Sequence, residues 1–375
     1  MPLRAKPFLA GKSGATPERR SKASREEFVA DRGLARSQPG PDVAVVIPFF
    51  DGSKFIRRAV ESVLSQTMPP AEFVIVNDGS KLEEAAFLHS LASELHFTVV
   101  DKENGGQGSA RNAGVAATFS PFICFLDQDD VFLPDHIEVL RNAVPPGGRF
   151  GWAYADLIEA DGDAQVVRTS IVKTHGVHPK TDVLQLIGED MFVLPSAAII
   201  SRPAFESVGG FDPQFMGYED DDLFLRMFRA NYTNVFVDRP VTIWCMHPAS
   251  TSFSMRMSRS RFRYFRKLHH AFPNVPERNR FVLRDQLIPR FHKAFMGEAF
   301  QAICRPRTAR GTVLGPHMDE LFRIARDYRD IVVCDPFVGR RRKWIVRLQT
   351  AILATRSPIL CEAALLLARL ARRSP

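Results

Sequence analysis

The chain has 375 residues, of which 45% are hydrophobic and 25% are charged, and its formal net charge is +8. This ordinary globular composition excludes collagen-like, fully disordered and mini-protein classes, and the length predicts two domains or one large domain with an appendage. The five cysteines form no CxxC pair, which argues against a disulfide framework or a structural zinc site. No apolar stretch approaches the roughly 20 residues of a membrane-spanning helix, and no signal-peptide core opens the chain. We therefore expect a cytoplasmic protein.

The charge is distributed unevenly along the chain. Residues 1–40 carry a net charge of +5 and residues 256–375 a net charge of +17, so residues 41–255 carry −14. Residues 1–40 are rich in polar residues, Gly and Pro without an apolar period, which predicts a disordered basic tail. An acidic central region between basic ends is typical of a protein with a cation-dependent site. It is not typical of a protein with a uniform nucleic-acid-binding surface. We therefore expect no nucleic-acid partner.

From Val43 the sequence alternates short apolar runs with amphipathic segments. The runs predict buried strands at residues 43–47, 73–76, 97–100 and 122–126, and the amphipathic segments predict helices near residues 54–67, 82–94 and 109–118 and one opening at Pro134. This alternation predicts an α/β domain with a mostly parallel central sheet and helices on both faces. The second half of this domain is rich in predicted strands, among them residues 234–238 and 241–246, and carries one helix at residues 219–229. A basic helical region follows, so the predicted domains are 41–255 and 256–375.

Acidic residues follow several of the predicted strands. Ligands of such sheets bind beyond the carboxyl ends of the strands, where Asp51, Asp78 and the sequence DQDD at residues 127–130 lie. Asp127 and Asp129 are spaced so that both can face one cation, and their hard oxygen ligands suit Mg²⁺ or Mn²⁺. The alternative interpretation is a solvated acidic turn. Asp130 is expected to cap the helix that follows.

Five motifs occur in a fixed order. They are VAVVIPFFDGSKFIRRAVESVLSQT, FVIVNDGS, NGGQGSARNAG, FICFLDQDD and GGFDPQFMGYEDDDLFLRM, and they cover roughly residues 43–255. In this order the chain resembles the family 2 inverting glycosyltransferases, which have a GT-A fold. The resemblance implies metal-dependent transfer of a sugar from a nucleotide-diphospho-sugar to an acceptor hydroxyl, in the biosynthesis of a surface polysaccharide or glycoconjugate. The alternative is a catalytically silent scaffold of the same fold that binds a glycan or a nucleotide-sugar.

The resemblance also implies roles for individual residues. It assigns the nucleotide-sugar to Pro48, Phe50, Asp51, Asp78, Arg111 and Asp127, and a divalent cation, Mn²⁺ or Mg²⁺, to Asp129, Asp127 and His247. It makes Asp220 the general base and Glu219 the residue that orients the acceptor or the base. The family usually has an aromatic–Asn pair where this chain has Phe50 and Asp51. Acidic residues at 219–222 are also favoured in the first turn of any helix, and a lone histidine is often structural.

The basic region at residues 256–375 mixes cations, aromatic and apolar residues at partly helical spacing. One interpretation is the solvated face of helices packed on the catalytic domain. A second is peripheral contact with the inner face of the cell membrane, with Trp344 at the interface and Arg340 to Lys343 near anionic headgroups. The resemblance implies a glycan or lipid-linked acceptor, which suits this second interpretation. The sequence contains no recognisable RNA-binding module, which argues against RNA binding. It also contains no QxxRW-type segment, which is typical of processive synthases.

Overall fold

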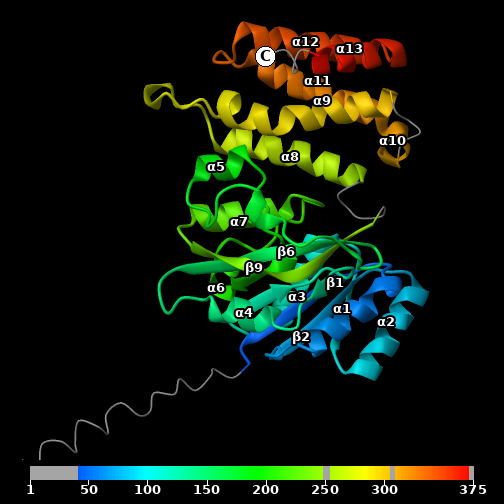
Figure 1. Cartoon of the computed structure of the whole chain (residues 1–375), viewed down its shortest axis with the longest axis vertical. Coiled ribbons are helices and arrows are strands. Elements are labelled where there is room, and N and C mark those ends of the chain that lie inside the picture. Colours follow the sequence, from blue (N-terminus) through cyan, green and yellow to red (C-terminus); the bar gives the residue numbers. More distant parts are fainter. Residues whose placement is uncertain (1–40, 248–253, 305–308, 371–375) are drawn as a thin grey trace, which may run out of the picture. The chain divides into compact units, whose positions relative to one another are not determined.

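The computed structural model describes residues 41–247, 254–304 and 309–370 (Figure 1). The described residues form a nine-stranded sheet with the order β3-β2-β1-β4-β8-β6-β9-β5, in which β7 pairs with β6 outside this path. The strands are β1 (Val43–Phe49), β2 (Glu72–Asp78), β3 (Thr98–Lys102), β4 (Phe122–Phe125), β5 (Val131–Phe132), β6 (Phe150–Asp161), β7 (Val166–Arg168), β8 (Ala198–Ser201) and β9 (Thr233–Met246).

Most strands of the sheet point the same way. Strands β1 to β4 pair in parallel. Because β8 is antiparallel to both β4 and β6, β6 points the same way as β4, and β9 pairs with β6 in parallel. The predicted mostly parallel sheet is confirmed, with the short strands β5, β7 and β8 running the other way. The segments that follow β1, β2, β4 and β9 therefore meet at one edge of the sheet.

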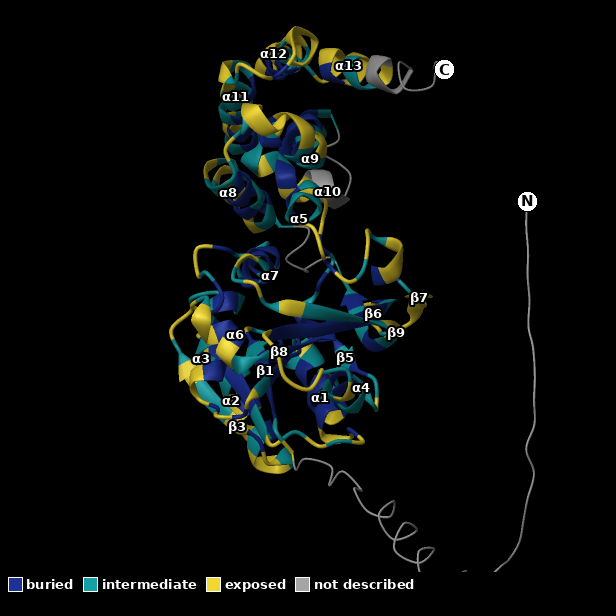
Figure 2. Ribbon diagram, turned by 90° about the vertical axis from the view of Figure 1, so that its left-hand side faces the viewer, coloured by how far each residue is buried: buried dark blue, intermediate teal, exposed yellow. Residues whose placement is uncertain are grey.

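Helices cover both faces of this sheet. The α-helices are α1 (Ser53–Leu64), α2 (Leu82–Leu95), α3 (Gln107–Ala116), α4 (His136–Asn142), α5 (Val183–Gly188), α6 (Arg202–Ser207), α7 (Glu219–Arg229), α8 (Met255–Ala271), α9 (Ile288–Cys304), α10 (Ala309–Leu314), α11 (Met318–Cys334), α12 (Arg340–Ala354) and α13 (Pro358–Leu370). Successive β1 residues alternate between two cores: Val45 and Ile47 pack in the core that includes α1 and α4, and Val46 packs in the core of α3 and α7. Figure 2 shows buried residues along the central strands. The predicted helices on both faces are confirmed.

Most predicted elements form close to their expected bounds, and β9 is an exception. The strands predicted at residues 234–238 and 241–246 are one continuous strand of 14 residues. Its pairing with β6 shifts register where Val237 pairs with Ala155 and Pro240 pairs with Asp156. This irregularity accommodates a proline, which cannot donate a hydrogen bond within a regular ladder.

The basic C-terminal region is helical, as predicted, and its buried aromatic residues continue the core around α7. Phe265, Phe291, Phe295 and Tyr328 pack with ring centroids 5.1–5.8 Å apart. Residues Pro41–Pro375 form one compact unit, so the division into domains 41–255 and 256–375 stays a prediction. The predicted tail at residues 1–40 lies outside the described residues.

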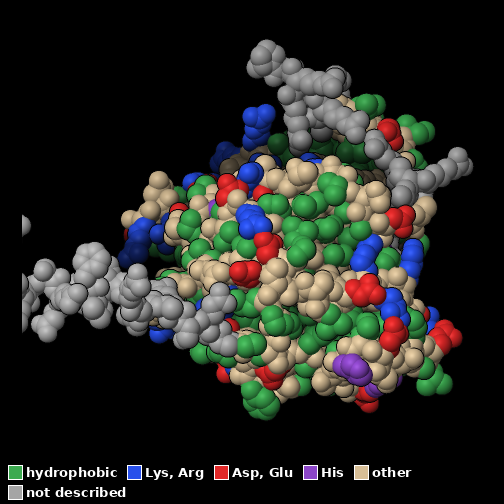
Figure 3. Space-filling model, turned by 60° about the horizontal axis from the view of Figure 1, so that its bottom comes forward, with side chains coloured by type: hydrophobic (Ala, Val, Ile, Leu, Met, Phe, Trp, Pro, Cys, Tyr) green, Lys and Arg blue, Asp and Glu red, His purple; other side chains and the backbone are tan. Residues whose placement is uncertain are grey.

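Two observations bear on contact with membranes and with other molecules. None of the helices in the described part of the chain is long and apolar enough to cross a membrane. The face drawn in Figure 3, which is the lower end of the molecule in Figure 1, carries acidic and basic side chains interspersed among apolar ones.

Candidate active site

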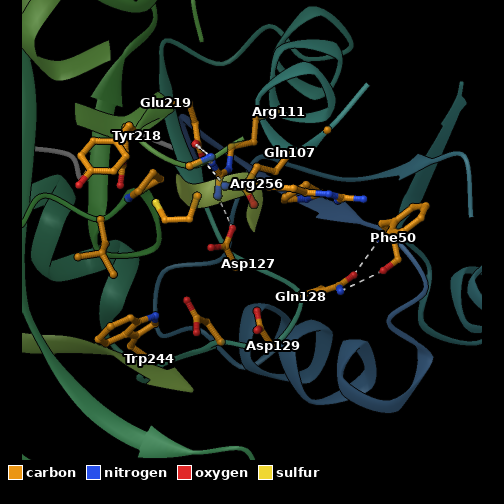
Figure 4. A pocket seen from close by; sticks show the side chains of 18 of the residues that line it. Phe50, Gln107, Arg111, Asp127, Gln128, Asp129, Tyr218, Glu219, Trp244 and Arg256 are labelled. Carbon is orange, nitrogen blue, oxygen red and sulfur yellow. Dashed lines mark hydrogen bonds and ion pairs between the residues drawn. The ribbon is translucent and has the colours of Figure 1, made fainter. Parts of the chain in front are cut away.

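A cavity of about 610 Å³ lies at the carboxyl edge of the sheet. It is lined by the segments that follow β1, β4 and β9, by the loop before α3, and by the first residues of α7 and α8 (Figure 4). Of the site residues predicted from the sequence, those that line it are Pro48, Phe50, Asp78, Arg111, Asp127, Asp129, Glu219, Asp220 and His247. Asp51 is not among the lining residues. Its carboxylate instead accepts a hydrogen bond from the backbone of Lys81 at 3.0 Å.

The loop after β1 is fastened to the turn after β4. The backbone N–H of Phe50 donates to Oε1 of Gln128 at 2.9 Å, and Nε2 of Gln128 donates to the carbonyl of Phe50 at 3.2 Å. Gly52 permits this approach, because a Cβ there would lie 2.3 Å from Oε1 of Gln128. The Phe50 side chain is 40% exposed, so its ring can stack on a flat partner such as a nucleotide base.

Asp78, at the end of β2, is buried and already has three donors. Its carboxylate accepts from the backbone N–H groups of Gly105 at 2.9 Å and Gly106 at 2.7 Å, and from Nζ of Lys102 at 2.6 Å. Gly106 has φ +84°, a conformation that favours glycine. Asp78 thus shapes the glycine loop that leads into α3, and a carboxylate has about four lone-pair sites, so one is left for a ligand.

Arg111 joins two acidic residues beneath the cavity. The guanidinium is 1% exposed, and it forms ion pairs with Asp127 and, at 3.0 Å, with Glu219. Burial opposes its charge, but the two carboxylates outweigh burial and raise the pKa of Arg111. Gln107 also donates to Glu219, as does the backbone N–H of Gly217 at 2.7 Å. Both terminal nitrogens of the arginine are therefore engaged within the protein.

Asp129 and His247 form a pair on another wall of the cavity. Nε2 of His247 lies 2.8 Å from Oδ2 of Asp129, and the imidazole stacks on Phe55 with centroids 4.7 Å apart. Burial, reinforced by the charge of Asp127, raises the pKa of Asp129. Asp130 does not cap a helix as expected, because its buried carboxylate accepts from the backbone N–H of Cys245 in β9 at 3.0 Å.

A divalent cation needs several ligand atoms that converge on one point. Among the described residues no group of three His, Cys, Asp or Glu side chains is placed to hold a metal ion. The predicted set of three ligands does not assemble, because Asp127 turns toward Arg111 and away from Asp129 (Figure 4). Asp129 and His247 remain as a two-residue set. The carboxylate of Asp129 suits Mg²⁺, which is often held by one or two carboxylates together with waters and substrate phosphates. The imidazole of His247 suits a transition metal better.

Four consecutive acidic residues open α7, and each has different surroundings. Glu219 is paired with Arg111, Asp221 with Arg290, and Asp222 with Lys267 at 2.6 Å. Asp220 lines the cavity, and its carboxylate has no cationic partner among the residues that the structure describes.

The surroundings of Asp220 also change its acidity. Burial, reinforced by the charges of Glu219 and Asp221, raises its pKa well above the ordinary value for aspartate. Its carboxylate accepts a hydrogen bond from the backbone N–H of Asp221 at 2.8 Å. This carboxylate is therefore the member of the acidic run that faces the cavity without being neutralised.

Several lining residues were not singled out from the sequence. Gln128 lies between Asp127 and Asp129 of the DQDD motif, and Trp244 lies three residues before His247. Arg256, Met257 and Arg261 come from α8, within the basic region that sequence patterns did not connect to the site. A cation run on a helix gives no sign of which of its members reach a distant cavity.

Comparison with solved structures defines the fold. The fold is similar to that of S. aureus TarS 1–349, with a TM-score of 0.58 and 14% identity over 86% of this chain and 91% of that one; the same fragment is also known in complex with UDP-GlcNAc. It is also similar to the mannosyltransferase PcManGT from Pyrobaculum calidifontis in complex with GDP-Man and Mn²⁺, with a TM-score of 0.51, 13% identity, and coverage of 84% and 87%. The predicted GT-A-type transferase fold is confirmed.

Sequence comparison supports the family resemblance. Residues 44–209 match the model of glycosyl transferase family 2, so the predicted resemblance to that family is confirmed. An uncharacterized glycosyltransferase of Bacillus subtilis, YwdF, is 27% identical over 65% of this chain and 90% of its own length. One of Rickettsia prowazekii is 27% identical over 56% of this chain and 66% of its own length. The succinoglycan biosynthesis protein ExoW of Rhizobium meliloti is 39% identical, over only 29% of this chain and 34% of its own length.

Proposed function

We propose that the protein transfers a sugar from a nucleotide-diphospho-sugar to an acceptor hydroxyl, with Asp220 as the general base. The observation that carries the proposal is the contrast within the first turn of α7. Three of its carboxylates are neutralised by Arg111, Arg290 and Lys267, whereas Asp220 faces the cavity and forms no ion pair with any described residue. A carboxylate with a raised pKa is a better proton acceptor near neutral pH than an ordinary one.

In the proposed reaction the acceptor oxygen attacks the anomeric carbon as its proton passes to the carboxylate of Asp220. The bond between that carbon and the diphosphate oxygen breaks, and the nucleoside diphosphate leaves with the bonding electron pair. Attack opposite to the leaving group inverts the anomeric centre. Glu219, fixed by Arg111, acts as a positioning residue that holds the first turn of α7 and hence Asp220.

The remaining residues bind the donor in this proposal. Phe50, Pro48 and Asp78 lie at the nucleotide end of the cavity, where the exposed ring supports stacking of the base. Asp129 and His247 would hold a divalent cation, which when bound neutralises charge on the diphosphate. UDP-GlcNAc and GDP-Man in complexes of proteins with this fold, and Mn²⁺ in one of them, support a nucleotide-sugar donor and metal use. The likeness to ExoW supports a role in polysaccharide biosynthesis.

Donor binding can be tested before the acceptor is known. UDP-, GDP-, CMP- and dTDP-sugars, each with and without Mn²⁺, are compared by the shift that they cause in the melting temperature. A ligand at 100 times its Kd stabilises the folded state by about 2.7 kcal/mol, so one nucleotide class should raise the melting temperature clearly, and only with metal. The variants D129A and H247A should lose the metal-dependent part of the shift. A flat response to every donor would support the silent-scaffold alternative instead.

A further inference from the structure

The exposed side of α8 carries a row of cationic side chains. Arg256, Arg259, Arg263, Arg266 and His270 are all exposed. At 100° per residue they lie within about 80° of one another around the helix, and at a rise of 1.5 Å per residue they extend over about 21 Å. We call these five residues the α8 basic row.

Acidic side chains do not balance this row. α8 contains no Asp or Glu, whereas exposed helices usually mix charges at i, i+4 spacing. Arg259 pairs with Glu320 at 2.7 Å, and Arg263 donates to a backbone oxygen. Within the described residues, Arg256 and Arg266 have no hydrogen-bonding or ionic partner. The row therefore keeps an excess of positive charge.

Helix stability does not explain the position of the row. Arg256 lies in the first turn of α8, which begins at Met255. The positive end of the helix dipole disfavours a cation there by about 0.3–1 kcal/mol. The placement thus costs helix stability, which suggests a binding role for the side chain.

The row begins in the active-site cavity and leaves it along the helix. Arg256 lines the cavity of about 610 Å³, and the other four members line a second cavity of about 480 Å³ next to α11. Phe262 and Ile324 also line this second cavity, which gives it an apolar part beside the cations. α8 exposes no large hydrophobic side chain, so it lacks the apolar anchors of helices that lie in membranes.

We propose that the α8 basic row binds an acceptor chain that carries repeated negative charges and leads its reacting end to Asp220. This inference rests on the proposed function, because it names the substrate class of the same site. Guanidinium groups bind phosphate and carboxylate groups in the same bidentate way. The acceptor is therefore an anionic glycan, whether its charge comes from phosphodiesters or from uronic acids.

The test compares two double variants of the full chain that lose the same charge. R263Q/R266Q neutralises two members of the row, and R340Q/R341Q neutralises two exposed arginines of α12. Fluorescently labelled inorganic polyphosphate, polygalacturonate and neutral dextran serve as probes in anisotropy titrations at low and at 300 mM salt. We expect the wild type to bind one or both anionic polymers, and more weakly at high salt because ions screen exposed charges. R263Q/R266Q should bind at least tenfold more weakly, and R340Q/R341Q within about twofold of the wild type.

Each possible result of the titrations has its own interpretation. Preference for polyphosphate or for polygalacturonate tells phosphate-bearing from carboxylate-bearing acceptors. The proposal would be overturned if dextran bound as tightly as the anionic polymers, or if both double variants lost the same affinity. Binding to phosphatidylglycerol vesicles but to neither anionic polymer would also overturn it, in favour of a membrane surface. The nucleotide-sugar melting experiment is independent of these titrations. If the polymer binds but no nucleotide-sugar raises the melting temperature, the proposed function is contradicted and the α8 basic row remains a polyanion-binding surface. If a nucleotide-sugar raises the melting temperature but no polymer binds, only the proposal for the α8 basic row is overturned.

Discussion

At the scale of single residues, the surroundings of the four carboxylates of α7 separate their expected roles. Asp220 faces the cavity without an ion-pair partner in the described part of the chain, and burial raises its pKa. A raised pKa means that the folded state binds the proton more tightly than the unfolded chain does. The stability that this carboxyl contributes is therefore present at low pH and is lost as the pH rises through the raised pKa.

The variant D220N should lower transfer and raise stability together. Loss of a general base costs roughly 10²- to 10⁴-fold in rate. Because asparagine cannot ionise, the variant should melt at a higher temperature than the wild type at neutral pH, and the difference should shrink toward pH of about 3.9. Turnover assays and melting curves from pH 4 to 8 measure both effects.

The neighbouring variant D221N serves as the control for D220N. It leaves the buried Arg290 unpaired and should lower stability by about 3–5 kcal/mol. Normal turnover by D220N would show that the base is another group.

Arg111 illustrates a role that depends on partners far away in the sequence. The resemblance places this residue on the donor, whereas its guanidinium is buried between Asp127 and Glu219. R111M should lower the free energy of unfolding by about 3–5 kcal/mol, because it leaves the buried carboxylate of Glu219 without its cation. Adding E219Q should recover part of this loss, as measured by urea unfolding. A variant R111M of unchanged stability with a tenfold higher KM for the donor would instead favour direct donor contact.

At the scale of elements, the packing of α3 on the sheet depends on one glycine. A Cβ on Gly114 would lie 2.3 Å from Cγ1 of Val46 and 3.1 Å from Cγ2 of Val76. G114A should therefore destabilise the protein, because overpacking costs about 1–3 kcal/mol and exceeds the helix-propensity gain of about 1 kcal/mol.

The matched control for G114A is G297A in α9, where a Cβ meets no atom within 4 Å. This variant should be neutral or more stable by up to about 1 kcal/mol in the same urea titration. In a V46A background the G114A substitution should lose its cost, because the clashing methyl group is gone. An equal cost in both backgrounds would rule out the close approach of α3 and β1 as the cause.

At the scale of the whole molecule, charge and apolar surface are separated between helices. The cations of α8 lie beside the cavity, whereas α12 and α13 expose Trp344, Leu348, Ile359 and Leu360 next to arginines. This second combination is typical of helices that rest on an anionic membrane surface. It supports the proposal that α12 and α13, and not α8, make any peripheral membrane contact.

Vesicle sedimentation tests this separation. The wild type should sediment with phosphatidylglycerol vesicles and much less with neutral phosphatidylcholine vesicles. W344A/L348A should reduce sedimentation severalfold, because burial of a large side chain contributes about 1.5–3 kcal/mol. R263Q/R266Q should have little effect. Sedimentation that is lost in the α8 variant and kept in W344A/L348A would reverse the two assignments.

The sequence alone determined the order of strands and helices, the family motifs and nine of the residues that line the cavity. Local periodicity and the rule that strand ends meet at one edge predicted the positions of Asp78 and Asp129, and the resemblance to the family added Pro48 and Asp220. The partners of those residues were decided only by the tertiary structure.

The physical reason is that charge pairing and burial depend on neighbours that are distant in sequence. Arg111 pairs with Glu219 across 108 positions and Asp129 with His247 across 118, and no local pattern specifies such contacts. The entry of Arg256 into the cavity likewise requires α8 to pack beside α7. The tertiary structure therefore decided which carboxylate stays unpaired, and how the basic region reaches the site.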